Sequence, residues 1–335
     1  MVAVIEPANP LIVDQSGFSA SGLRGEALRG VKRNINKITA VKIRSAGLRG
    51  LSFFTQLHFY IVPGAGFDKN RQMVKILFLG DVVGEPGRIA ACRTAGLYLE
   101  RGDADFVVVN GENAAAGRGI TPKLAIDLMR SGIAVITSGD HIWDQKEIFP
   151  FLDSEPRLLR PVNYPAGTPG NGSIVLDTAH GPIGVMNVQC RTFMNNPLEN
   201  PFLAASAEVE RIRKETPVIV VDVHGETTSE KIAMGRHLDG LVSLVIGTHT
   251  HVQTADEKIL PKGTAFLCDA GMCGPEDSIL GRDAAAVVER FKTSLPVKFP
   301  VARGPLMACG ALITVDPSTG RAASIKRVLE RYGAP

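Results

Sequence analysis

Two histidines separated by one residue are the first place in this sequence where residue types and spacing could support chemistry. His249 and His251 follow the apolar run 241–246. On a continuing strand both side chains would share one face, whereas in a turn just past the strand they could bind neighbouring metal ions. Neutral imidazole is a common ligand for borderline metal ions, but one such pair fits many protein surfaces. The pair therefore indicates a metal site only if other ligands accompany it.

Four other apolar runs end in residues that can bind hard or borderline cations. These runs are 76–80, 106–111, 135–139 and 218–223. The polar residues at their ends are Asp81, Glu112, Asn113, Asp140, His141 and His224. In open α/β folds, ligands bind outside the carboxyl ends of the strands. The shared position at strand ends therefore predicts one site built from all five segments.

The elements that must position these side chains follow a strand and helix rhythm from Met73 onward. Apolar residues at helical spacing predict a helix over 87–101, and Thr121 and Pro122 predict the start of a second helix, with Thr121 as its N-cap. Repeats of this length imply parallel strands joined by right-handed crossovers.

The second half of the chain has a different rhythm. Short strand patterns at 173–177 and 182–188 predict a hairpin. Further patterns predict helices at 201–214 and 226–238 and strands at 217–223, 264–268, 308–315 and 322–329. The whole pattern predicts two mixed sheets packed face to face, with helices outside.

The composition is that of an ordinary globular chain. The 335 residues are 44% apolar and 21% charged, which predicts one large α/β domain with an appendage. No run approaches the roughly 18 apolar residues that a membrane span needs, and the N-terminus lacks a secretory pattern. The five scattered cysteines indicate reduced thiols. We therefore expect a cytoplasmic protein.

The first 72 residues differ from the remainder in charge and pattern. They contain ten Lys and Arg against four Asp and Glu, which leaves 27 against 30 for the rest. The mildly acidic body argues against stable nucleic-acid binding. We expect 1–72 to be a disordered extension, or to lie upstream of the true start of the protein at Met73. A basic transit-like segment is a third interpretation, which we favour less. Residues 73–335 form the predicted catalytic domain.

In order and spacing, the polar blocks resemble the calcineurin-like metallophosphoesterases, and specifically the YmdB-like branch of bacterial phosphodiesterases. The blocks are Gly80-Asp81, Gly111-Glu112-Asn113, Gly139-Asp140-His141, Val223-His224 and the segment 247–251. The similarity covers 73–335 and includes the segments 143–144, 191–194 and 269–275. The resemblance implies a metallophosphoesterase domain with a four-layer αββα sandwich of two mixed sheets.

The resemblance also implies a site for two metal ions, with iron or manganese as the expected metals. One ion would be held by Asp81, Glu112, Asn113 and His251. The other would be held by Glu112, Asp140, His224 and His249, so that Glu112 bridges the two. Carboxylates balance the metal charge, imidazoles suit iron and manganese, and two ions roughly 3.5 to 4 Å apart can stabilise an in-line phosphoryl displacement.

The activity implied by the resemblance is hydrolysis of small nucleotide phosphodiesters, with cyclic nucleotides such as 2′,3′-cyclic NMP and cAMP as substrates. A metal-bridging hydroxide would attack phosphorus. His141 would donate a proton to the leaving oxygen, a task that suits an imidazole.

One residue departs from the family pattern. The family generally has Asn before the histidine, whereas this chain has Asp140. An ionised Asp140 should hold the second metal more tightly but attract an anionic substrate less. The alternative is that Asp140 turns away from the site and pairs with a cation.

Other functions and simpler structural roles stay open. The protein could be a regulator whose metal site is structural or senses a nucleotide, or it could be a phosphomonoesterase. Taken alone, Asp81 could cap a helix and His224 could be a buried structural histidine. The fold alone, however, would not place polar residues at five strand ends. Trp143 could stack on a base or pack beside His141. The sequence does not decide whether the protein forms a homo-oligomer.

Overall fold

The computed structural model of this protein describes residues 73–196 and 198–334. The expectation of a disordered extension over 1–72 lies outside the described residues. The helices are α2 (Gly84–Glu100), α3 (Pro122–Arg130), α4 (Ile148–Ser154), α5 (Pro201–Ile212), α6 (Thr228–His237) and α7 (Ala284–Thr293).

The strands form two sheets. The first sheet contains β1 (Val74–Leu79), β2 (Asp81–Val82), β3 (Phe106–Asn110), β4 (Val135–Thr137), β11 (Met272–Pro275), β12 (Leu306–Val315) and β13 (Ala322–Tyr332). The second sheet contains β5 (Ser173–Leu176), β6 (Ile183–Gln189), β7 (Ile219–His224), β8 (Leu244–Thr248), β9 (Lys258–Ile259) and β10 (Ala265–Leu267).

Both sheets are mixed. The first sheet has the order β2-β11-β12-β1-β3-β4, with β13 paired to the side of β12. Its strands β1, β3 and β4 are parallel, and β12 is antiparallel to β1. The second sheet has the order β5-β6-β7-β8-β10-β9, in which the four central strands are parallel and the two edge strands are antiparallel. The site-bearing strands of each sheet therefore end at the same edge.

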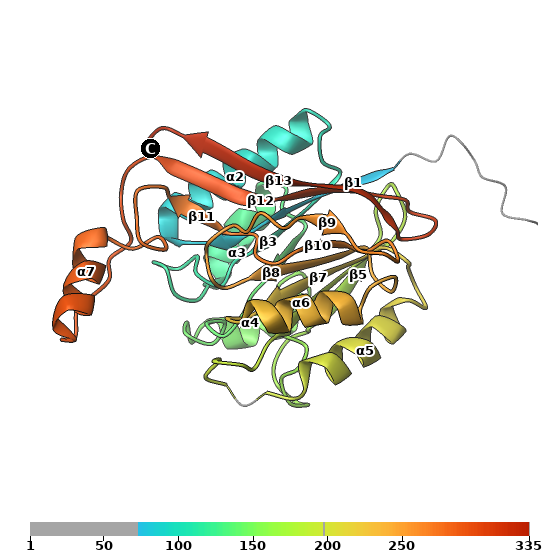
Figure 1. Cartoon of the computed structure of the whole chain (residues 1–335), viewed down its shortest axis with the longest axis horizontal. Coiled ribbons are helices and arrows are strands. Elements are labelled where there is room, and N and C mark those ends of the chain that lie inside the picture. The colour runs from blue at the N-terminus through green and yellow to red at the C-terminus, as the bar shows by residue number, and fades with distance from the viewer. Residues whose placement is uncertain (1–72, 197, 335) are drawn as a thin grey trace, which may run out of the picture. The chain divides into compact units, whose positions relative to one another are not determined.

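Alternating apolar side chains build the layers. In β1, Leu77 points to a core shared with α2 and α3, whereas Phe78 points to the core between the sheets. In β7, Val220 faces the core between the sheets and Val221 faces the core under α5 and α6. Because successive side chains of a strand point to opposite faces, the apolar residues of each sheet pack against a core on both of its faces. Figure 1 shows α5 and α6 along the second sheet and α2 on the far side of the first. The expected αββα sandwich is confirmed.

Most elements lie where the sequence patterns place them. The hairpin of β5 and β6 is present, and the Thr121 side chain accepts a hydrogen bond from the Leu124 backbone N–H at 3.3 Å as the N-cap of α3. Helix α7 was not expected, and only Val287 is buried in it. Within the described residues, no helix is long and apolar enough to cross a membrane.

Candidate metal centre

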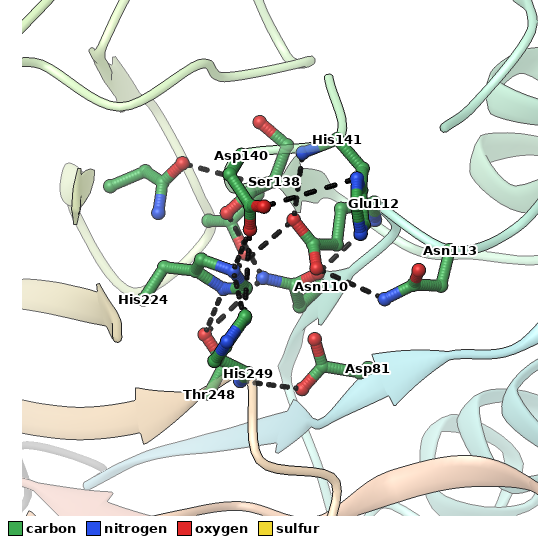
Figure 2. Close-up of polar contacts among 12 residues, drawn as sticks. Asp81, Asn110, Glu112, Asn113, Ser138, Asp140, His141, His224, Thr248 and His249 are labelled. Atoms are coloured by element: carbon green, nitrogen blue, oxygen red, sulfur yellow. Dashed lines mark hydrogen bonds and ion pairs between the residues drawn. The ribbon is translucent and has the colours of Figure 1, made fainter. Parts of the chain in front are cut away.

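The structure brings the predicted ligands together at the edge where the site-bearing strands of both sheets end. Those strands are β1, β3 and β4 of the first sheet and β7 and β8 of the second. Figure 2 shows carboxylates and imidazoles from these strand ends directed toward a common space. The position of the site therefore follows the strand-end pattern of the sequence.

Four of the ligands form a tight cluster, which we call the His224 group. Its members are Glu112, Asp140, His224 and His249, and one possible ligand atom from each lies within 4.8 Å of the others. His224 Nε2 lies 3.1 Å from Asp140 Oδ1, 3.2 Å from Glu112 Oε2 and 3.0 Å from His249 Nδ1. This arrangement of two carboxylates and two imidazoles suits one borderline metal ion.

The other ligands, which we call the His251 group, are more loosely arranged. His251 Nε2 lies 3.3 Å from Asn113 Nδ2 and 3.8 Å from Asp81 Oδ1. Glu112 lies between the two groups, because its Oε1 accepts a hydrogen bond from Asn113 Nδ2 at 3.0 Å while its Oε2 faces His224. Asn113 presents its amide nitrogen to Glu112, so binding a metal through Oδ1 requires its amide to turn over.

The backbone around the two histidines is irregular, as the sequence led us to expect. His249 has φ of 98° and His251 has φ of 65°. Such positive values in residues with side chains are costly and persist where surrounding contacts enforce them. The Asp269 carboxylate supplies such contacts, because it accepts hydrogen bonds from Thr250 and from the buried Lys231. Asp81 Oδ2 also accepts a hydrogen bond from the His249 backbone at 3.1 Å.

Hydrogen bonds outside the cluster determine which ring nitrogens face it. His224 Nδ1 lies 2.9 Å from Thr248 Oγ1, and that hydroxyl donates to Asp222 Oδ1 at 2.7 Å. His251 Nδ1 lies 3.2 Å from the Leu280 carbonyl, which can only accept. Both contacts place the proton on Nδ1 and leave Nε2 with a free lone pair toward the site. These supporting residues were not predicted from the sequence. The Thr248 hydroxyl could have indicated them, because it lies at a strand end next to the predicted ligand His249.

Burial and neighbouring charges shift the pKa values of the site residues. Burial, with the charge of Asp269, raises the pKa of Asp81 to about 7. Burial, with the charges of Asp140 and Asp81, raises the pKa of Glu112 well above its ordinary value. Burial also lowers the pKa of His224 to about 3, so its imidazole is neutral and able to act as a ligand.

Two further observations show that the residues present fit divalent metal ions. The Asp81 Oδ1 atom is buried and has no hydrogen-bond partner among the described residues, although a buried carboxylate oxygen is costly without one. At Gly139 a Cβ would collide with Glu112 and His224, so the chain keeps this space free of side chains. The combination of carboxylates, an amide and imidazoles suits iron or manganese.

Asp140 points into the His224 group. Burial acts to raise its pKa, but the surrounding imidazoles hold that pKa below its ordinary value. Among the described residues, its ion-pair contacts are to His141, His224 and His249, and not to Lys or Arg. The orientation therefore supports a ligand position over the alternative in which Asp140 turns away.

His141 lies beside the cluster rather than within it. Its backbone N–H donates to Glu112 Oε2 at 3.4 Å, while its ring Nδ1 lies 3.0 Å from Asp144 Oδ2. The side chain is 28% exposed, so solvent or a substrate can reach it. Trp143 stacks on Phe149 at 5.2 Å between ring centroids, which favours packing over base stacking for that residue.

Comparisons with known proteins identify the family to which the chain is similar. Residues 77–328 match the sequence model of a family described as YmdB-like protein. A protein of Bacillus subtilis (strain 168), named 2′,3′-cyclic-nucleotide 2′-phosphodiesterase, is 48% identical over 256 residues, which are 76% of this chain and 97% of that protein.

Two solved structures are also similar. The crystal structure of a hypothetical protein from Thermus thermophilus has a TM-score of 0.72 and 37% identity, and the match covers 77% of this chain and all of that one. The structure of a novel phosphatase from Mycoplasma pneumoniae has a TM-score of 0.74 and 31% identity, with 79% of this chain and 96% of that chain covered.

Proposed function

This chain belongs to the YmdB-like protein family, and from this premise we propose that it is a metal-dependent phosphodiesterase that hydrolyses small cyclic nucleotides. The family relationship confirms the expected enzyme class, a phosphoric diester hydrolase. The observation that carries the finer proposal is the position of Glu112, whose two oxygens face the His224 group and the His251 group.

The proposed metal ligands divide according to these two groups. The His251 group and Glu112 would hold one ion, and the His224 group would hold the other. When bound, divalent ions stabilise negative charge on phosphoryl oxygens and make water a stronger nucleophile. Iron or manganese is the proposed metal, since both accept mixed carboxylate and imidazole ligands.

The chain's own residues perform the remaining tasks. Glu112 and Asp140 direct carboxylate oxygens into the site, and Thr248 and Leu280 hold two imidazoles with their lone pairs facing it. His141, which is accessible and lies outside the ligand cluster, would donate a proton from its ring to the leaving oxygen. A pure binding module has no need of such a group, which supports an enzyme over a regulator.

Asp140 favours diesters over monoesters. A phosphomonoester carries one more negative charge than a diester near neutral pH, and an added carboxylate in the site repels that charge. We therefore propose phosphodiesters as substrates, with 2′,3′-cyclic nucleotides as the first class to test.

We also propose that residues 73–335 form the catalytic domain. Every proposed site residue lies between Asp81 and His251, and the family match spans 77–328.

The test of this function compares metal-loaded and chelated protein. We expect the manganese-loaded protein to hydrolyse 2′,3′-cyclic AMP and bis(p-nitrophenyl) phosphate, with far less activity on p-nitrophenyl phosphate. Chelation should abolish turnover, and added manganese should restore it. A manganese-loaded protein without diester turnover would favour the regulator, and higher monoester than diester activity would favour a phosphomonoesterase.

A further inference from the structure

One carboxylate oxygen contacts both the proposed proton donor and an arginine from another loop. Asp144 Oδ2 lies 3.0 Å from His141 Nδ1 and 2.5 Å from Arg118 Nε. Arg118 Nε donates a hydrogen bond to Asp144 Oδ2, and His141 Nδ1 lies at ion-pair distance from the same oxygen. A carboxylate beside Nδ1 favours a proton on that nitrogen, so Nε2 is the ring nitrogen left to carry the proton that the charged ring would donate to a substrate.

Asp140 competes for the same ring nitrogen. Its Oδ2 lies 3.9 Å from His141 Nδ1, which is close enough for an ion pair but longer than the contact to Asp144. Asp140 Oδ1 faces His224. If the His141 ring rotated toward Asp140, the imidazole would pair with a proposed metal ligand. Nε2 would then no longer point toward the substrate. An uncharged Asn at this position would compete much less.

The loop that carries Arg118 is packed against the segment that carries Asp144. Gln145 Nε2 donates to the Arg118 carbonyl at 2.9 Å. At Gly119, where φ is 75°, a Cβ would lie 2.8 Å from Gln145 Cγ and 3.3 Å from Asp144 Cβ. Arg282 donates to the Ala116 carbonyl at 3.2 Å and so anchors the same loop from its other side. These contacts place the Arg118 guanidinium beside Asp144.

We propose that Asp144 is a positioning residue that holds the His141 ring in the orientation for proton donation and keeps it from pairing with Asp140. Arg118 holds Asp144 in place. This inference rests on the proposed function, because it concerns His141 as the proton donor. The ion pair of Arg118 and Asp144 is too exposed to contribute much to stability, with 67% and 27% of the two side chains accessible. Its role is therefore the orientation of His141.

The test uses Asp144→Asn in the manganese-loaded full chain, with two diesters that differ in their leaving groups. Loss of a partner that orients a site residue typically costs about 10- to 100-fold in activity. We expect a fall of this size in kcat for 2′,3′-cyclic AMP, with KM and manganese content unchanged. For bis(p-nitrophenyl) phosphate the loss should be much smaller, because nitrophenolate departs without a proton. Arg118→Ala should show the same pattern more weakly.

Two further variants serve as controls. Asp127→Asn makes the same substitution at an exposed ion pair with Lys123 in α3, and it should leave the turnover of both diesters unchanged. In an Asp140→Asn background, the added loss from Asp144→Asn should shrink, because the competing carboxylate has been removed.

Equal losses for both diesters, or an unchanged kcat, would overturn the inference. If the wild type itself lacks turnover, the proposed function fails, and the protonation of the His141 ring decides the role of Asp144 separately. The donor form of the ring carries a proton on both nitrogens, so nitrogen-15 NMR of the zinc-loaded protein reads the neutral form, whose single proton should lie on Nδ1 in the wild type and be distributed over both nitrogens in Asp144→Asn. Identical ring signals in the two proteins would contradict positioning by Asp144.

Discussion

The two ligand groups share Glu112 but differ in how far the chain has organised them. In the His224 group the ligand atoms contact one another directly, with His224 Nε2 within 3.2 Å of three partners. In the His251 group, Asp81 Oδ1 has no hydrogen-bond partner within 73–196 and 198–334, and Asn113 directs its amide nitrogen toward Glu112. A preorganised set of ligands loses less freedom when an ion binds. We therefore expect the His224 group to bind its metal more tightly and the His251 group to bind second.

The largest effect is expected from removing the residue that the groups share. Glu112→Gln keeps the size of the side chain but takes one negative charge from both groups. Turnover should fall to the level of the chelated protein, and metal content should drop at both positions. Elemental analysis measures the metal content, and a diester assay measures the turnover. Retention of one full metal equivalent would mean that Glu112 is a ligand in only one of the two groups.

His141→Ala should separate chemistry from metal binding. The substitution removes a proposed acid and no ligand, so both metals should remain while turnover falls by about 10² to 10⁴-fold. The loss should be smaller for nitrophenyl diesters. Elemental analysis supplies the check, because a collapse of metal content would place His141 among the ligands.

Asp140→Asn should change the metal affinities of the two groups to different extents. Loss of one carboxylate should weaken metal binding in the His224 group on the order of tenfold, which corresponds to about 1.4 kcal/mol. The His251 group should be little affected. KM for diesters should fall or kcat should rise, since the site then repels the anion less. Metal titration measures both affinities, and an unchanged affinity would remove Asp140 from the ligands.

The smallest effect is expected from deleting residues 1–72. Both ligand groups and every residue of the proposed mechanism lie beyond Met73, so folding, metal content and turnover should stay unchanged. Thermal unfolding and the diester assay compare the two proteins. A truncated protein that is insoluble or markedly less stable would contradict the proposed domain boundary.

The sequence predicted the fold and the location of the site because both depend on patterns that repeat along the chain. Apolar runs predicted the strands, and polar residues within a few positions after β1, β3, β4 and β8, together with the last residue of β7, predicted the candidate site. Helix α7 was not predicted, although Val287, Val288 and Phe291 recur at helical spacing, and only Val287 of these is buried.

Contacts between distant residues could not be predicted in the same way. The pair of Thr248 and Asp222 orients His224 only after β7 and β8 lie side by side. The orientation of Asp140 depends on His224 at the end of β7 and His249 after β8, as well as on its neighbour His141. The contact of His141 with Asp144 is the exception, because a spacing of three residues in a loop is visible in the sequence.

Anomalous diffraction from crystals of the manganese-loaded protein shows whether two ions bind, because it locates each ion and identifies its ligands. We expect two manganese peaks in each chain, one bounded by the His224 group and one by the His251 group. Glu112 should contact both ions, and Asp140 should contact only the first. A single peak, or two peaks with Glu112 bound to only one, would contradict the account.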